Sequence, residues 1–271
     1  MADVISQEFQ LYDMAHQLQN KNSPGRDITR LPAEFIIVCV LAFIAGISAT
    51  IYFCSSMCCG MKMPGDWTMS MMWMRMSGQT WLTSFLSFLL MWLAMMVAMM
   101  MPSALPMFLK TRRQWTSLCY MASGYFAIWL VAGAGIYVLG MTFGSVTMES
   151  ELVSRAVPLI SGALLIATGL IQFSRWKMTH LLRCRSSSGC SISCPQHETS
   201  FRLGYKQGVT CCICCAAPMT IQLVFGIMNP FAMIAVAIVI TAEKLLPRPV
   251  VLTRIVGAAA ILAGFIVATP L

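Results

Sequence analysis

The strongest constraint in this sequence is a succession of long apolar runs separated by short polar connections. A helix of roughly 20 residues crosses the ~30 Å hydrocarbon core of a lipid bilayer. Runs of about this length lie at 33–54, 81–104, 117–142, 155–173, 208–228, 230–246 and 250–269. Because backbone polar groups must be satisfied internally in lipid, each run is predicted to be a helix. We therefore expect an all-α fold, a polytopic transmembrane bundle of about seven helices.

The composition agrees with this class, because 58% of the residues are hydrophobic and only 10% are charged. Soluble domains rarely reach such values, so the lipid bilayer is the expected surrounding. Residues 1–32 are predicted to form an amphipathic or partly ordered cytoplasmic segment. Residues 33–271 are predicted to form one membrane domain, with a Met-rich outer loop at 55–80 and a basic, Cys-containing inner loop at 174–207.

The distribution of Lys and Arg predicts the orientation, because cytoplasmic loops are enriched in basic residues. With a cytoplasmic N-terminus, only Lys62, Arg75 and Arg155 of the 18 basic residues fall outside. The net charge of +8 is then explained by topology, and no nucleic-acid partner is predicted.

Ionisable residues are expected only near the ends of the apolar runs, which argues against a proton-coupled transporter. The chain has three His, all outside these runs, so a bis-histidine haem or a histidine-bound copper centre within the bilayer is not expected. The sequence also contains no phosphate-binding or nucleophile motif. No catalytic residue or organic cofactor site is therefore predicted, and we expect a protein that is not an enzyme.

Sulfur is unusually abundant, with 24 Met and 12 Cys. Thioether and thiolate are soft ligands that together select Cu(I), whereas Met also fills irregular helix interfaces. The first group of Met lies in the outer loop and comprises Met57, Met61, Met63, Met69, Met71, Met72, Met74 and Met76. A solvated loop has no packing reason for so many Met, so capture of Cu(I) is predicted. Two alternatives remain open: the loop enters the membrane interface, or Cys54, Cys58 and Cys59 form a disulfide among themselves.

A second group of Met lies in the second predicted helix. Met91, Met95 and Met99 are four residues apart and form a stripe along one helix face. Taken alone, such a stripe is more typical of helix packing than of a ligand set. Pro102 and Pro106 are expected to end or kink this helix.

The most specific signal is four Cys within five residues in the fifth predicted helix. Cys211, Cys214 and Cys215 share one face of that helix, and Met219 follows one turn later. The second and fifth helices run in opposite directions, so Met95 to Met101 and these Cys are expected at similar depth. A single Met/Cys site for copper, including Met95 and Met99, is one interpretation.

The basic inner loop carries Cys184, Cys190, Cys194 and His197. These residue types suit a Cys3His zinc site, although their spacing is not that of a standard zinc finger. Thiols that stay reduced in the cytoplasm are the alternative.

Several short motifs extend over about residues 33–264. They are Met91 and the run Met-x-Ala-Met-Met-x-Pro-Ser at 96–103, followed by Gly124, Tyr125 and Trp129, then Gly169, Gln172, Lys177, Cys184 and Arg185, then Gly208, Cys211, Cys214 and Cys215, and finally Gly226, Met228, Asn229, Met233, Glu243, Lys244 and Pro247. These motifs resemble an uncharacterised bacterial family of predicted metal-binding integral membrane proteins. The family commonly has Gly and Trp where this chain has Ile213 and Ala216. The resemblance implies metal binding and a place in the bacterial inner (cytoplasmic) membrane.

Two functions from different classes follow. The first is a copper-handling membrane protein that captures, delivers or stores Cu(I). The second is a non-catalytic accessory subunit of a larger membrane complex, for example one built around a copper-dependent enzyme. Small residues that permit close helix contact with such a partner are Gly133, Gly135, Gly140, Ala258, Ala259, Ala260 and Gly264. A thiol oxidoreductase is a third option, but no Cys-x-x-Cys lies in a recognisable redox fold.

Overall fold

A computed structural model describes residues 33–56, 60–64, 67–70, 80–110, 115–186, 197–246 and 249–269. The chain divides into two compact units, Met1–Ile36 and Ile37–Leu271, and every site discussed below lies in the second. The predicted segment 1–32 lies outside the described residues, so its form remains a prediction.

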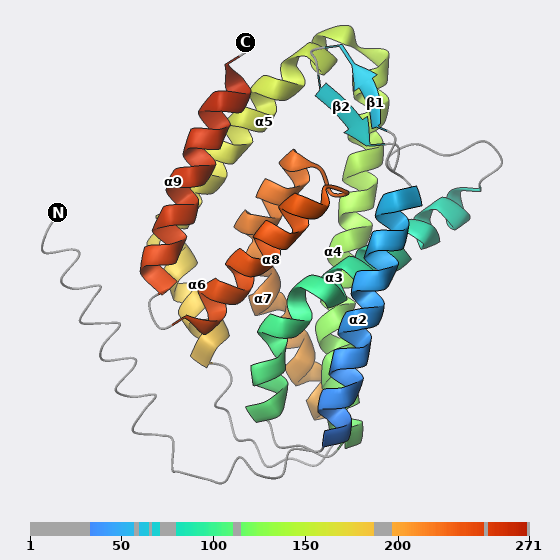
Figure 1. The fold of residues 1–271 in the computed structure, drawn as a ribbon, viewed down its shortest axis with the longest axis vertical. Coiled ribbons are helices and arrows are strands. Elements are labelled where there is room, and N and C mark those ends of the chain that lie inside the picture. Colours follow the sequence, from blue (N-terminus) through green and yellow to red (C-terminus); the bar gives the residue numbers. More distant parts are fainter. Residues whose placement is uncertain are drawn as a thin grey trace, which may run out of the picture. The chain divides into compact units, whose positions relative to one another are not determined.

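The prediction of an all-α fold is confirmed (Figure 1). The helices of the described residues are α2 (Ala33–Ser56), α3 (Trp81–Lys110), α4 (Trp115–Glu149), α5 (Glu151–Gln172), α6 (Arg175–Ser186), α7 (His197–Phe225), α8 (Pro230–Leu245) and α9 (Pro249–Ala268). One small hairpin accompanies them. Its strands, β1 (Gly60–Met63) and β2 (Trp67–Ser70), pair antiparallel with Gly60 opposite Ser70.

Within the described residues, six helices are long and apolar enough to cross a membrane. They are α2, α3, α4, α5, α7 and α9, and the chain is therefore a multi-pass membrane protein. The seventh predicted span is present as α8, but its 16 residues extend only about 24 Å. This is shorter than the ~30 Å hydrocarbon core, so α8 does not qualify by length.

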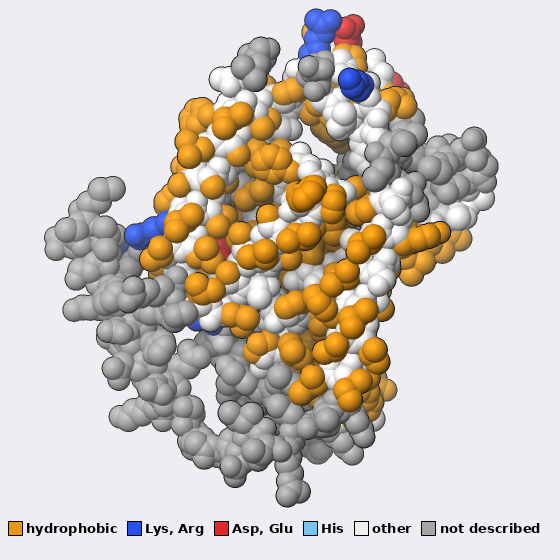
Figure 2. All heavy atoms as spheres, in the orientation of Figure 1, with side chains coloured by type: hydrophobic (Ala, Val, Ile, Leu, Met, Phe, Trp, Pro, Cys, Tyr) orange, Lys and Arg blue, Asp and Glu red, His pale blue; other side chains and the backbone are white. Residues whose placement is uncertain are grey.

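The surface of the helices is rich in exposed apolar side chains, which cover much of the face shown in Figure 2. Leu152 is 83% exposed and Phe231 is 82% exposed. An apolar surface this extensive is unfavourable in water but is the normal exterior of a protein in lipid.

Small residues bring helix pairs into close contact. A Cβ at Gly162 of α5 would lie 2.6 Å from the carbonyl oxygen of Gly264 on α9, so these helices pack backbone to backbone. A Cβ at Gly204 of α7 would overlap the backbone of α4 at Met121. A Cβ at Gly133 of α4 would overlap the Trp92 indole of α3. Gly133 and Gly264 thus allow close contacts within this chain, whereas the sequence analysis considered them for contact with a partner.

A tight turn joins α7 to α8, where the sequence places the boundary between the runs 208–228 and 230–246. Gly226 has a φ of 98°, a conformation that favours glycine. The Asn229 side chain then accepts hydrogen bonds from the backbone N–H groups of Phe231 and Ala232, and Pro230 occupies the first turn of α8. By contrast, Pro102 and Pro106 do not end their helix, because α3 continues to Lys110.

Candidate metal centre

The cysteines of α7 meet another cysteine from α6 in the interior. The sulfur atoms of Cys211 and Cys215 lie 3.8 Å apart, and Cys214 interacts with Cys215. Cys184 of α6 lies close enough to Cys211 and Cys214 to interact with both. All four side chains are buried. We call these four residues the thiol cluster.

Cys212, the remaining member of the run, is half-buried and makes none of these hydrogen bonds. The helical period explains the difference, because residue 212 lies on another face of α7 than residues 211 and 215. The shared face of Cys211, Cys214 and Cys215 therefore follows the sequence prediction.

Two polar side chains contact the thiol cluster at Cys211. The Lys244 ammonium of α8 lies 2.9 Å from the Cys211 sulfur, and the Tyr125 hydroxyl of α4 lies 3.0 Å from it. Lys244 also donates a hydrogen bond to the Ser103 hydroxyl of α3 at 3.1 Å. Helices α3, α4, α6, α7 and α8 thus all contribute to this region, and a cation faces one of its sulfurs.

The Cys184 thiol is buried beside Cys211 and Cys214. Its hydrogen bonds to Cys211 and Cys214, together with burial, raise the pKa of the Cys184 thiol well above its usual range.

The described residues contain no group of three or more His, Cys, Asp or Glu side chains already arranged to hold a metal ion. Cys211 and Cys215 are paired through a hydrogen bond instead. Binding of a metal to this pair requires that bonds from sulfur to the metal replace that hydrogen bond.

A second polar network adjoins the thiol cluster. The Lys177 ammonium of α6 lies 3.0 Å from the Glu243 carboxylate of α8, with the two side chains 1% and 2% exposed. Lys177 also donates to the carbonyl oxygen of Cys214 at 2.6 Å, and Gln172 lies 3.5 Å from the Glu243 carboxylate. The sequence analysis assigned Lys177 and Lys244 to the inner side from their charge, and the structure adds that both take part in interior hydrogen bonds.

The Met of α3 lie in the interior. Met91, Met95, Met96, Met99 and Met100 are each at most 3% exposed. One of them contacts α7 directly, because the Gln222 amide nitrogen lies 3.4 Å from the Met95 sulfur. Met219 is also buried on α7. The structure therefore brings α3 and α7 together at Met95, and a metal-ligand role for Met95, Met99 and Met219 remains a prediction.

The Met of the predicted outer loop fall into different surroundings. Met69 is 2% exposed and lies near the Thr147 hydroxyl of α4, whereas Met61 is 38% exposed. The hairpin is held by Trp67, whose indole donates a hydrogen bond to the Ser154 carbonyl oxygen at 3.0 Å. Packing of the hairpin against α4 and α5 thus accounts for Met69. Met57, Met71, Met72, Met74 and Met76 lie outside the described residues.

The predicted zinc group remains untested as a set. Cys190 and Cys194 lie outside the described residues, and the placement of the His197 side chain is likewise not described. Cys184, the fourth member, belongs to the thiol cluster.

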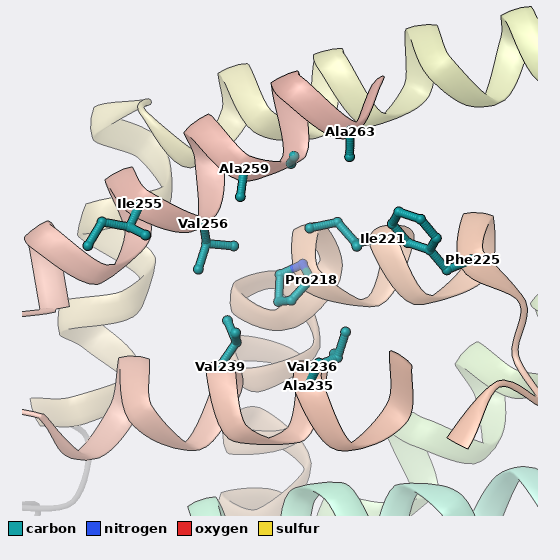
Figure 3. A pocket seen from close by; sticks show the side chains of 11 residues that line it. Pro218, Ile221, Phe225, Ala235, Val236, Val239, Ile255, Val256, Ala259 and Ala263 are labelled. Atoms are coloured by element: carbon teal, nitrogen blue, oxygen red, sulfur yellow. The ribbon is translucent and has the colours of Figure 1, made fainter. Parts of the chain in front are cut away.

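An apolar pocket of about 300 Å³ lies between α7, α8 and α9 (Figure 3). Its lining residues are Pro218, Ile221, Phe225, Ala235, Val236, Val239, Ile255, Val256, Ala259, Ala260 and Ala263. Since none of them has a sulfur, a charge or a hydroxyl, this pocket is not the metal centre.

The fold and the buried sulfur define a multi-pass membrane protein with a thiol cluster between its helices. Residues 89–267 match the model of the PpoB2 family, described as copper chaperone, and this match spans more than half of the chain. The chain belongs to that family. Comparisons with curated proteins and with solved structures found no match.

Family membership confirms that this is a copper-handling membrane protein. It also makes the resemblance to predicted metal-binding membrane proteins more specific, because the metal is copper. A copper chaperone is a carrier, in line with the expectation of a protein without catalysis.

Proposed function

We propose that the chain binds Cu(I) as cargo at the thiol cluster and delivers it to a copper-dependent membrane enzyme. The observation that carries this proposal is the grouping of four buried cysteine side chains from α6 and α7, with two of their sulfurs 3.8 Å apart and the Lys244 ammonium 2.9 Å from one of these two. The family description as copper chaperone supports the nature of the cargo.

The ligand chemistry favours Cu(I). Thiolates are soft ligands that suit a soft monovalent ion, whereas Mg²⁺ or Ca²⁺ would require oxygen ligands. The Cys211–Cys215 separation of 3.8 Å lets both sulfurs bind one ion at about 2.3 Å each, the usual metal–thiolate distance. Two thiolates and one Cu(I) carry a net charge of −1, which the Lys244 ammonium offsets.

Thioethers give the cargo further soft ligands. Met219 follows the cysteines on α7, and Met95 contacts α7 through Gln222. Met95 and Met99 are proposed to hold Cu(I) transiently as it leaves or reaches the cluster. The outer Met-rich loop is proposed to capture the ion first. For the whole chain, a cytoplasmic N-terminus and a location in the bacterial inner membrane are also proposed.

The test is the copper content of the purified, full-length protein after equilibration with Cu(I) under reducing, oxygen-free conditions. The combined substitution Cys211→Ser, Cys214→Ser and Cys215→Ser is expected to remove at least one copper per chain, measured by plasma mass spectrometry. Cys212→Ser is the matched control, because Cys212 lies in the same run but outside the cluster.

Equal copper in the triple variant and in Cys212→Ser would refute the cluster as the binding site. Size-exclusion chromatography of both variants in the same detergent establishes that they remain folded and monodisperse. X-ray absorption at the copper edge adds a second readout, because loss of the cluster must reduce the number of sulfur neighbours per copper.

A further inference from the structure

A second pair of sulfur atoms lies away from the thiol cluster. Cys54, near the end of α2, places its sulfur 3.8 Å from the sulfur of Met228, in the turn between α7 and α8. The Cys54 sulfur also lies 3.6 Å from the Met228 carbonyl oxygen. Cys54 is only 9% exposed, so water has little access to its thiol. The two residues are 174 positions apart in sequence, and the fold alone brings them together.

The separation of these sulfurs suits a shared metal ion. If each sulfur binds at about 2.3 Å, a separation of 3.8 Å gives a sulfur–metal–sulfur angle of about 110°. That angle is close to those of trigonal and tetrahedral coordination. A thiolate and a thioether are both soft donors, and this combination selects Cu(I) among the biological metals.

The pair lies beyond the C-terminal end of α7, whereas the thiol cluster lies near the middle of this helix. Cys211 is the central residue of α7, and Met228 comes after the last residue of the helix, Phe225. The helical rise from 211 to 225 is about 21 Å. Met95, which contacts Gln222 of α7, lies along this interval. Since α7 is long and apolar enough to cross a membrane, the two sulfur sites belong to the middle and to one end of a candidate spanning helix.

We propose that Cys54 and Met228 form a second Cu(I) site, which exchanges cargo with the thiol cluster along α7. On binding, the Cys54 thiol loses one proton and its thiolate forms a bond to Cu(I), while Met228 adds a thioether bond; no electron is transferred. This proposal rests on the proposed copper cargo. It extends the copper chemistry beyond the region of family similarity, because residues 89–267 include Met228 but not Cys54.

The experiment measures copper per chain in the full-length protein equilibrated with buffered Cu(I) under reducing, oxygen-free conditions. Cys54→Ser and Met228→Leu are each expected to lose one copper. The double variant is expected to lose no more than either single variant, because both residues bind the same ion. Matched controls are Cys212→Ser and Met148→Leu, since Cys212 lies outside the cluster and Met148 is 50% exposed on α4.

The same substitutions in the triple-cysteine background separate this proposal from the previous one. The second site is supported if the triple variant retains one copper and loses it when Met228→Leu is added. This result is independent of whether the thiol cluster binds copper. Unchanged copper in Met228→Leu would overturn the second site and leave the cluster untouched. Loss with Cys54→Ser alone would also overturn it, because Met228 would then not be a ligand.

A measurement on the unmodified protein guards against a misfolded variant. Cu(I) is expected to slow alkylation of the Cys54 thiol several-fold relative to that of the exposed Cys119, followed by mass spectrometry of peptides. An alkylation rate of Cys54 that Cu(I) leaves unchanged relative to Cys119 would contradict the second site.

Discussion

Replacing Lys177 with Met removes the ammonium group that faces the Glu243 carboxylate at 3.0 Å in the protein interior. Met retains much of the side-chain volume, so the change acts mainly on charge and hydrogen bonding. The carboxylate is left with the neutral Gln172 amide at 3.5 Å, and the Cys214 carbonyl oxygen loses a hydrogen bond of 2.6 Å.

The magnitude follows from burial. Lys177 and Glu243 are 1% and 2% exposed, and removal of one partner from such a pair costs about 3–5 kcal/mol. The surface pair of Arg155 and Glu151 offers a matched control, because its side chains are 68% and 65% exposed. Arg155→Met is expected to cost less than about 1 kcal/mol.

The assay is the free energy of unfolding in mixed micelles titrated with a denaturing detergent, followed by tryptophan fluorescence. Lys177→Met with Glu243→Leu is expected to recover much of the loss, because two apolar residues leave no unpaired charge. If Lys177→Met costs no more than Arg155→Met, the reasoning is refuted, because the pair must then be accessible to water.

Two further changes test the packing and the cation of the centre. Gly204→Ala is expected to lower the free energy of unfolding by about 1–3 kcal/mol, since a Cβ there would overlap the α4 backbone, whereas Gly135→Ala enters open space and should be neutral or stabilising. Equal effects in the same unfolding assay would contradict the close contact of α4 and α7. Lys244→Met removes the ammonium 2.9 Å from the Cys211 sulfur and is expected to weaken Cu(I) binding about 10- to 100-fold, measured by competition with a Cu(I) chelator. The exposed Lys206→Met should change nothing, and an equal affinity for both lysine variants would exclude a role for the interior cation.

Hydrophobicity located the helices but not all of their ends. The predicted spans at 155–173 and 250–269 correspond closely to α5 and α9. By contrast, α7 begins at His197, well before the predicted start at 208, and α4 continues to Glu149. The physical reason is that an apolar run indicates only the part of a helix that can lie in lipid. The backbone hydrogen bonds of the same helix continue into the polar residues on either side.

The thiol cluster was predictable in part. Helical spacing alone places Cys211, Cys214 and Cys215 on one face, because that is a local property of the chain. The addition of Cys184 and Lys244 depends on how α6 and α8 pack against α7, which periodicity does not encode. One signal did exist: both residues belong to the motifs of the family resemblance, and motif residues distant in sequence are candidates for mutual contact.

The charges show the limit of counting basic residues by loop. Lys177 follows the predicted span 155–173 and Lys244 lies near the end of the span 230–246. Both were assigned to the inner side, yet Glu243 and Cys211 provide them with interior partners. Burial of a charge is tolerated when it is paired, so position in sequence alone does not make it a loop charge. The predicted cytoplasmic N-terminus therefore depends on the other basic residues.

The ion pair and the thiol cluster are joined through adjacent residues. Glu243 pairs with Lys177, and Lys177 donates a hydrogen bond to the Cys214 carbonyl oxygen. Lys244, which follows Glu243 in the sequence, contacts the Cys211 sulfur. A change at the ion pair should therefore shift the turn of α7 that carries the cysteines. We expect Lys177→Met to lower both the free energy of unfolding and the copper content, whereas Arg155→Met lowers neither. Full copper in a destabilised Lys177→Met variant would show that the two networks are neighbours without being coupled.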